Sequence, residues 1–166
     1  MDSGTLDPAY GPQPGKPMGA AAEQLHFDDR FPYGTDAHGN PLTEVSWNER
    51  YVDSADSMQF APNGGAVIGT RVQYTDVDAF LRDFGDLKLD RLGELDGGYM
   101  GAGGGTFSER ALPLGQRLQE QLHELSLTGK PLPAGWRIEI SLIADAYGRP
   151  GGGYKLSCEQ TLTHQI

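Results

Sequence analysis

The most regular pattern in the chain is the alternation of apolar and polar side chains over residues 136–144 (WRIEISLIA). A period of two residues places the apolar side chains on one side of an extended chain, so this segment is predicted to be a half-buried β-strand. Shorter runs over residues 87–92 and 154–163 are also predicted to be strands. Residues 116–127 fit two patterns, because their leucines suit a helix in the first part and a strand at the end.

Two segments have the spacing of short helices. In residues 75–84 (TDVDAFLRDF) apolar side chains recur every three or four positions, and acidic residues occupy the first turn. Thr43 is placed to cap a second helix that runs to Tyr51. Gly-rich segments separate the elements: residues 60–70 are predicted to be a loop leading into a short strand, and residues 97–107 a flexible loop. Several strands with a few short helices predict an α+β fold with a mainly antiparallel β core.

The chain length of 166 residues suits one domain with a tail. Residues 1–22 carry Pro and Gly without apolar periodicity and are predicted to be a flexible lead-in or linker. Residues 23–166 are then the folded domain. The 24 glycines and 11 prolines make up about a fifth of the chain, which indicates a loop-rich fold rather than a disordered one.

The formal net charge of −10 narrows the classes of ligand. A surface of this sign repels nucleic acid and anionic lipid, because both require clustered Lys and Arg, so neither is expected as a partner. A small phosphate ligand remains compatible if a few cations gather in one place. No apolar run approaches the roughly 18 residues of a membrane span. The N-terminus lacks the basic and apolar segments of a conventional signal peptide, and the single Cys158 excludes an intramolecular disulfide.

Basic and aromatic residues next to Gly-rich loops are the candidates for chemistry. Arg91 ends the predicted strand LKLDRL, Tyr99 follows in GGYMG, and Arg110 lies in FSERALP. A guanidinium can meet phosphate oxygens in pairs, an aromatic face can stack on nicotinamide or adenine, and Gly loops let backbone N–H groups approach a phosphate. No loop has the spacing of a Rossmann or P-loop motif, so a dinucleotide would be bound in another way.

Read in order, several segments are similar to the successive motifs of the tuberculosis necrotizing toxin (TNT) family. They are FAPNGGAVIGT, LDRLGELDGGYM, TFSERALPLG, GKPLPAG and AYGRPGGGYKL. The resemblance covers about 100 residues, from Phe60 to Glu159. It implies that residues 23–166 form a TNT-like domain with NAD(P)+ glycohydrolase activity, which hydrolyses NAD+ or NADP+ to nicotinamide and ADP-ribose or its phosphate.

The resemblance also implies roles for individual residues. Arg91 and Arg110 correspond to phosphate-binding arginines, and Tyr99 to the aromatic residue beside the first of them. His123 falls near a functional histidine, and Lys155 stands where the family has a Gln that acts at the nicotinamide ribose. The implied catalytic residues are Arg91, Arg110, His123 and Lys155. The implied substrate-binding residues are Phe60, Tyr99, Tyr147, Gly151, Gly152 and Gly153.

Lys155 is the main departure from the family pattern. Lysine carries a charge and has no acceptor, so it is expected to repel the cationic nicotinamide or an oxocarbenium ion unless burial lowers its pKa. Glu109 and Glu139 are both candidates for a carboxylate that stabilises such a cation. One alternative therefore stays open: an NAD-binding or ADP-ribosyl transferase- or cyclase-like domain with impaired hydrolysis.

The resemblance further implies the setting in which the domain acts. NAD+ or NADP+ is the substrate, and neither a separate cofactor nor a metal ion is expected. A toxin endangers the cell that makes it, so a cognate immunity protein is an expected partner. Such a domain is expected to be secreted or delivered as an effector.

Overall fold

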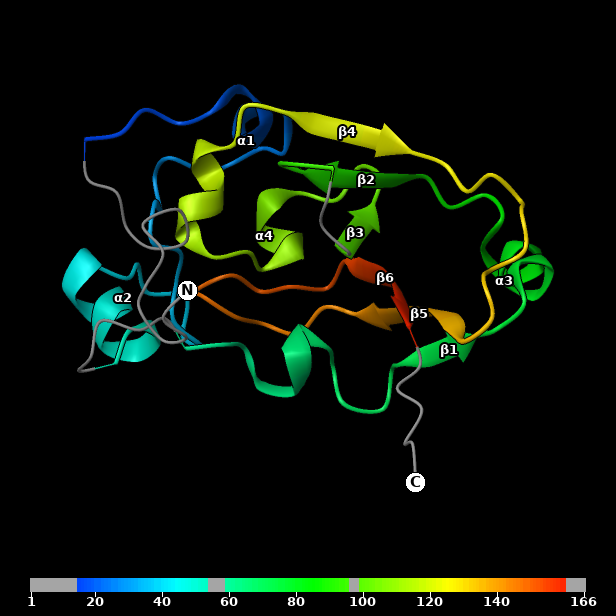
Figure 1. Cartoon of the computed structure of the whole chain (residues 1–166). Coiled ribbons are helices and arrows are strands. Elements are labelled where there is room, and N and C mark those ends of the chain that lie inside the picture. The colour runs from blue at the N-terminus through cyan, green and yellow to red at the C-terminus, as the bar shows by residue number, and fades with distance from the viewer. Residues whose placement is uncertain (1–14, 54–58, 96–98, 161–166) are drawn as a thin grey trace.

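The computed structural model describes residues 15–53, 59–95 and 99–160. Within these residues the strands form a six-stranded antiparallel sheet in the order β1-β5-β6-β3-β2-β4 (Figure 1). The strands are β1 (Val72–Tyr74), β2 (Leu89–Leu92), β3 (Tyr99–Ala102), β4 (Leu122–Leu125), β5 (Trp136–Leu142) and β6 (Tyr154–Gln160). The helices are α1 (Ala20–Gln24), α2 (Glu44–Tyr51), α3 (Val77–Phe84) and α4 (Phe107–Arg110), with 3-10 turns η1 (Pro62–Gly65) and η2 (Leu114–Leu118). The predicted α+β class with an antiparallel core is confirmed.

The predicted strands over 136–144, 87–92 and 154–163 are confirmed as β5, β2 and β6, although residues 161–163 lie outside the described residues. The ambiguous segment 116–127 contains both kinds of structure. The 3-10 turn η2 occupies its beginning, and β4 pairs with β2 at the edge of the sheet. The strand interpretation is therefore confirmed at Leu125, and the helical interpretation, which included Leu122 and Leu125, is wrong beyond Leu118.

The prediction of a flexible loop over 97–107 is wrong for residues 99–102. This stretch forms β3, which pairs with β2 on one side and with β6 on the other. Glycine disfavours strands locally, but a position between two partner strands outweighs that preference. Helix α4 then begins at Phe107, where the side chain of Thr106 accepts a hydrogen bond from the Glu109 backbone N–H.

Helix α3 closes one face of the sheet. The buried cluster beneath it comprises Val77, Phe80, Leu89, Ile138, Ile140 and Leu156. Figure 1 shows α3 at one end of the molecule and α1 and α4 toward the other, where Ala21, Leu25, Leu92 and Phe107 form a second cluster. Alternation along β5 and β6 turns their remaining side chains, most of them polar, to the opposite face. We call this the open face, and it carries the candidate site.

Helix α2 begins at the predicted cap, Thr43, whose side chain accepts a hydrogen bond from the Ser46 N–H. Its buried residue Trp47 donates from Nε1 to the carbonyl of Tyr147, at 3.1 Å, and stacks on the Tyr147 ring with centroids 6.2 Å apart. Tyr51 packs on both rings. The helix is therefore fixed to the loop that leads into β6.

The predicted lead-in over residues 1–22 is too long at its C-terminal end. Gly19 donates its N–H to the carbonyl of Arg117 at 2.8 Å, and Ala21 and Ala22 of α1 are fully buried. Small side chains let α1 lie close to η2, which a composition-based prediction of a linker overlooks. Residues 1–14 lie outside the described residues. Within the described ranges, no helix combines the length and apolar character needed to cross a membrane.

Candidate functional site

The open face is organised in two rows of side chains that run across the strands. Register places Asp90, Gly101, Lys155 and Ser141 in one row. It places Tyr99, Ser157, Glu139 and Gln73 in the next. Neighbouring strands of a sheet lie only about 5 Å apart, so side chains of paired residues come close together. The face therefore gathers side chains that are distant in sequence.

Tyr99 and Lys155 meet at the centre of this face. The Tyr99 side chain is 55% exposed, and the Lys155 Nζ atom lies 4.2 Å from the centroid of its ring. Nζ also donates a hydrogen bond to the carbonyl of Gly64 in η1, at 2.5 Å. Burial lowers the pKa of Lys155 below its ordinary value, and the charge of Arg71 lowers it further. The charges of Glu139 and Glu159 act in the opposite direction but do not outweigh these two effects, and the direct contacts of the ammonium are a ring and a carbonyl.

Arg91 lies beside Tyr99 but contacts its backbone. The guanidinium donates to the carbonyl of Tyr99 at 2.7 Å and to the carbonyl of Glu94. Register sets His123 of β4 directly opposite Arg91 of β2. The structure thus brings Arg91, His123 and Tyr99 to one end of the sheet. Alternation along β2 directs Arg91 and Asp90 to opposite faces, so Arg91 is linked to Lys155 only through Tyr99.

Arg110 is committed to an ion pair inside the protein. It is 7% exposed and donates from Nη1 and Nη2 to the two carboxylate oxygens of Asp90, at 2.5 and 2.8 Å. Its Nε atom donates to the carbonyl of Gly105 at 3.0 Å. A Cβ atom on Gly101 would lie 2.7 Å from Nη1, so only glycine leaves room for this guanidinium. Arg110 therefore has a structural role in this fold, and its predicted phosphate-binding role stays a prediction.

The three glycines predicted to approach the substrate are also engaged. The N–H groups of Gly151 and Gly153 donate to the carbonyls of Ser108 and Glu109, at 3.1 Å each, and that of Gly152 to Ile143 at 2.8 Å. These bonds tie the loop before β6 to α4 and to the end of β5. These N–H groups therefore form a structural connection here rather than a free phosphate cradle, and the predicted contact of this loop with substrate stays a prediction.

Tyr147 and Phe60 occupy very different environments. Tyr147 is 7% exposed, has a left-handed φ of 55° and donates its hydroxyl to the carbonyl of Gln59 at 3.0 Å. Its ring packs among Trp47 and Tyr51 in a buried cluster, and its predicted contact with substrate stays a prediction. Phe60 is 88% exposed and precedes η1, whose Gly64 contacts Lys155. Its role as a substrate contact stays a prediction.

The sequence patterns missed the group around Glu139. Arg71 donates to the Glu139 carboxylate and to the carbonyl of Asn63, and Gln73 donates to Glu139 at 3.0 Å. Burial raises the pKa of Glu139, but the hydrogen bonds from Gln73 and Arg71 outweigh burial and leave the pKa below its ordinary value. No local motif marks these residues, because Arg71 and Glu139 are 68 positions apart.

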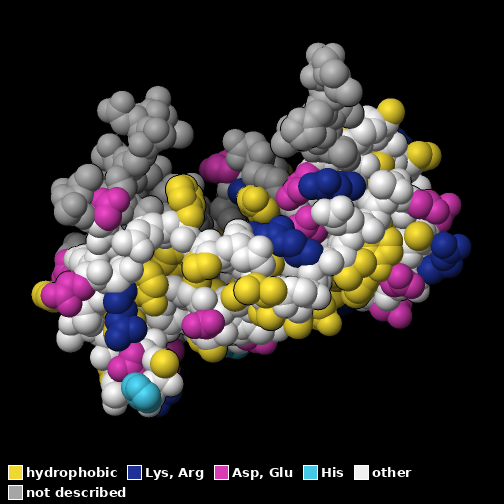
Figure 2. Space-filling model, turned by 90° about the horizontal axis from the view of Figure 1, so that it is seen from below, with side chains coloured by type: hydrophobic (Ala, Val, Ile, Leu, Met, Phe, Trp, Pro, Cys, Tyr) yellow, Lys and Arg dark blue, Asp and Glu magenta, His cyan; other side chains and the backbone are white. Residues whose placement is uncertain are grey.

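The two candidate carboxylates are now distinguished. Glu109 accepts a hydrogen bond from the Thr106 N–H at 2.9 Å, and hydrogen bonds from Thr106 lower its pKa. Its carboxylate therefore forms part of the capping box at the start of α4. Glu139 shares the open face with Tyr99 and Lys155. Figure 2 shows basic and acidic side chains next to one another in the middle of the surface it presents, rather than one large field of either sign.

Arg149 is a buried cation that lacks an ion-pair partner among the described residues. It is 5% exposed, lies 4.9 Å from the Phe27 centroid and 5.5 Å from the Phe107 centroid, and donates to the Pro32 carbonyl at 2.9 Å. Burial lowers its pKa to about 10, against a smaller opposing effect of Asp28. Its charge is thus a cost to folding, and its planar bulk fills space.

Arg149→Met is therefore expected to keep or raise the free energy of unfolding, by about 0–2 kcal/mol, because Met fills much of the volume without a buried charge. Arg149→Ala is expected to lower it by about 2–3 kcal/mol, since a cavity opens between the two rings. Urea denaturation followed by circular dichroism measures both. Equal losses in the two variants would contradict this account and assign the stability to the charge.

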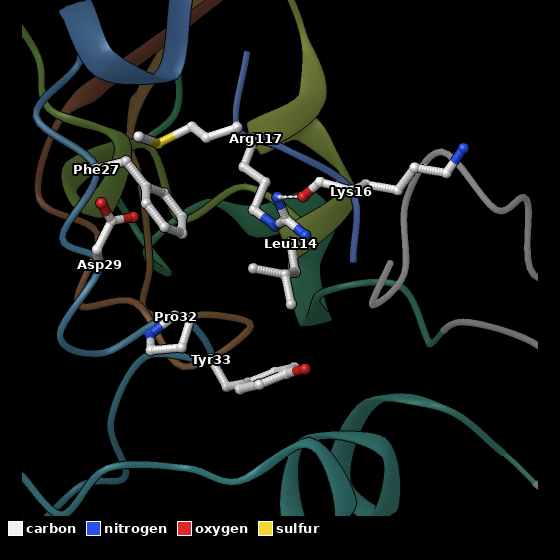
Figure 3. Close-up of a pocket in the computed structure, with 8 residues that line it drawn as sticks. Lys16, Phe27, Asp29, Pro32, Tyr33, Leu114 and Arg117 are labelled. Atoms are coloured by element: carbon white, nitrogen blue, oxygen red, sulfur yellow. Dashed lines mark hydrogen bonds between the residues drawn. The ribbon is translucent and has the colours of Figure 1, made fainter. Parts of the chain in front are cut away.

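A cavity of about 200 Å³ lies away from the predicted residues. It is lined by Lys16, Met18, Phe27, Asp29, Pro32, Tyr33, Leu114 and Arg117. Figure 3 shows the guanidinium of Arg117 donating to the Lys16 carbonyl, at 3.0 Å, on the side opposite Phe27 and Asp29. None of the residues singled out from the sequence lines it. The predicted site and this cavity are separate features.

Comparison with known proteins assigns the class of the domain. The sequence model of the family described as tuberculosis necrotizing toxin matches residues 85–166. A solved structure of tuberculosis necrotizing toxin complexed with its immunity factor IFT superposes with a TM-score of 0.72 and 31% identity, covering 94% of this chain and 78% of that chain. The chain therefore belongs to the tuberculosis necrotizing toxin family and is a toxin-type domain.

Two curated relatives are similar over most of the chain. Both are named outer membrane channel protein CpnT, one from Mycobacterium tuberculosis (strain ATCC 25618 / H37Rv) and one from Mycobacterium bovis (strain BCG / Pasteur 1173P2). Each is 36% identical over 141 residues, which is 80% of this chain and 16% of the relative. The chain thus spans about a sixth of the length of these relatives.

Proposed function

We propose that this domain hydrolyses the bond between nicotinamide and ribose in NAD+ or NADP+. The observation that carries the proposal is the exposed Tyr99 ring, flanked by Arg91 at its backbone and Lys155 at its face, in a member of a toxin family. An aromatic platform beside cations suits a ligand that combines planar rings with phosphates.

The reaction places modest demands on the protein. Nicotinamide leaves as a neutral molecule, because the electron pair of the broken glycosidic bond stays on its ring nitrogen and neutralises the positive charge there. Positive charge develops on the ribose at the same time. Tyr99 would stack on a planar ring on the open face. The donors of Arg91 not used by the two carbonyls would meet phosphate oxygens at the end of β2 and β3, where Arg91 reaches the Tyr99 backbone from the other face. The carboxylate of Glu139, ionised at neutral pH, would add a favourable negative potential on the same face. His123 is paired with Arg91 and shares its face of the sheet, so its predicted catalytic role stays a prediction.

The test is product analysis. Purified protein is expected to convert NAD+ or NADP+ to nicotinamide and ADP-ribose or its phosphate, measured by liquid chromatography. Tyr99→Ala is expected to lower kcat/KM by about 10- to 100-fold, because a stacking contact is lost. Tyr154→Ala is the matched control, since this exposed tyrosine of β6 packs beside Phe84 on the α3 side. Intact NAD+ and NADP+, or equal activity in the Tyr99 and Tyr154 variants, would contradict the proposal.

A second candidate function rests on Lys155, which stands on the Tyr99 face where the family has Gln. The domain would then bind the nucleotide, or transfer or cyclise ADP-ribose, with hydrolysis impaired. The same chromatography separates these functions, because transfer and cyclisation release nicotinamide without free ADP-ribose. An inert protein in which Lys155→Gln restores hydrolysis would establish this second function.

We further propose that a cognate immunity protein binds this domain and that the domain is delivered as an effector. The support is the solved toxin of the family, which is described as complexed with its immunity factor IFT. Co-purification of the domain with the product of a neighbouring gene would test the partner. Loss of NAD+ turnover in the resulting complex would show that the partner is an inhibitor.

A further inference from the structure

The open face holds a cation in excess of its carboxylates. Among the described residues of β1, β5, β6 and the segment before β1, three cationic side chains lie there: Arg71, Arg137 and Lys155. Arg71 is paired with Glu139, and Arg137 with Glu159 at 3.3 Å. No ion pair formed within the described part of the chain includes Lys155. The charge of Lys155 is therefore the one that these neighbours leave without a counter-ion.

The contacts of Lys155 leave it able to take up an anion. An ammonium has three N–H donors. One is used by the Gly64 carbonyl, and the Tyr99 ring lies against the ammonium at 4.2 Å from Nζ. Neither of these two contacts carries a negative charge. Burial and the charge of Arg71 lower the pKa of Lys155 more than the charges of Glu139 and Glu159 raise it. A bound anion would reverse that balance without breaking the bond to Gly64.

The two other charged residues near this row, Asp90 and Arg110, are already paired with each other. Asp90 lies two strands from Lys155 in the same row, but both of its oxygens accept from Arg110. Arg110 in turn directs three of its five N–H donors at Asp90 and the Gly105 carbonyl, inside the protein. Of the cationic side chains on the open face, Lys155 is the one that makes no ion pair with a carboxylate of the described residues.

We propose that Lys155 is a phosphate-binding cation of this site, and that it takes up a phosphate of the nucleotide whose base or ribose packs on Tyr99. The inference rests on the proposed function for the kind of ligand, a pyridine dinucleotide, and gives a phosphate-binding role to the position where the family has Gln. Lys155 then acts as a determinant of specificity for phosphorylated over unphosphorylated nucleosides. A phosphate dianion is a suitable ligand for a compact point charge with free donors.

The test compares ligands that differ by one phosphate. Isothermal titration measures the Kd of nicotinamide mononucleotide against nicotinamide riboside, and of AMP against adenosine. In the wild-type protein, one phosphorylated ligand is expected to bind at least about tenfold more tightly than its nucleoside. Lys155→Gln is expected to remove this difference while the nucleoside binds as before. Lys155→Arg, which keeps the charge, is expected to retain most of it. Lys130→Gln, at an exposed lysine in the loop before β5, is the matched control.

Three results would overturn the inference. The first is that the ratio of Kd values between nucleoside and nucleotide is the same in wild type and Lys155→Gln. The second is that the nicotinamide ligands bind more tightly to Lys155→Gln, which would mean that Lys155 disfavours their binding. The third is that wild type binds none of the four ligands. Hydrolysis of NAD+ that continues together with an unchanged phosphate difference would refute the inference alone. Absence of both binding and hydrolysis would refute the proposed function as well.

Discussion

Asp90→Ala is expected to lower the free energy of unfolding by about 3–5 kcal/mol, the cost of leaving one charge of a buried pair without its partner. Asp90 and Arg110 are both almost fully enclosed, and the carboxylate accepts two of the guanidinium's hydrogen bonds. After the substitution, Arg110 keeps only the Gly105 carbonyl as a hydrogen-bond partner. Chemical denaturation with fluorescence detection measures the loss.

The control is an ion pair of the same sheet that is less buried. Glu159→Ala breaks the contact with Arg137. Both side chains of this pair are about a third exposed, so the substitution is expected to lower the free energy of unfolding by less than about 1 kcal/mol. A double variant, Asp90→Leu with Arg110→Met, removes both charges and is expected to restore most of the stability. If this double variant folds normally but loses nucleotide affinity more than tenfold, Arg110 binds phosphate and its structural assignment is wrong.

The sequence allowed the prediction of those elements whose signal is local. The alternation over residues 136–144 identifies β5, because Ile138 and Ile140 of that stretch lie in the core under α3. The caps Thr43 and Asp76 mark the starts of α2 and α3 in the same way. Strand β3 was missed, since Gly101 has a poor strand propensity and is required by Arg110, a residue of another element.

The contacts of the candidate site also differ in how far apart their residues lie in the sequence. Arg91 and Tyr99 are joined across the hairpin between β2 and β3, so a spacing of eight residues was enough to associate them. The contact of Lys155 with Gly64 spans 91 positions, and no periodicity reports such a distance. The resemblance to the family placed Arg110 and the glycines before β6 near the ligand, but sequence similarity does not reveal how a side chain or an N–H group is engaged within the fold.

A pair of glycine substitutions separates a structural loop from a ligand-binding one. Gly151 has a φ of 71°, and a Cβ atom there would lie 2.5 Å from the Ile143 carbonyl oxygen and 2.6 Å from that of Ala144. Gly151→Ala is therefore expected to lower the free energy of unfolding by about 3 kcal/mol or more, from backbone strain together with overpacking against main-chain atoms. Thermal unfolding followed by circular dichroism measures the loss.

Gly152→Ala is the matched control. Gly152 also has a left-handed φ, of 99°, but a Cβ atom there meets nothing within 4 Å. Its substitution is expected to cost only the strain of that conformation, about 1–2 kcal/mol. Because the Gly152 N–H is bonded to Ile143 and not to a ligand, nucleotide turnover by the folded variant is expected to be unchanged. A stable Gly152→Ala protein that no longer binds the nucleotide would mean that this loop opens to contact the phosphate, since the added methyl group has no other neighbour to disturb.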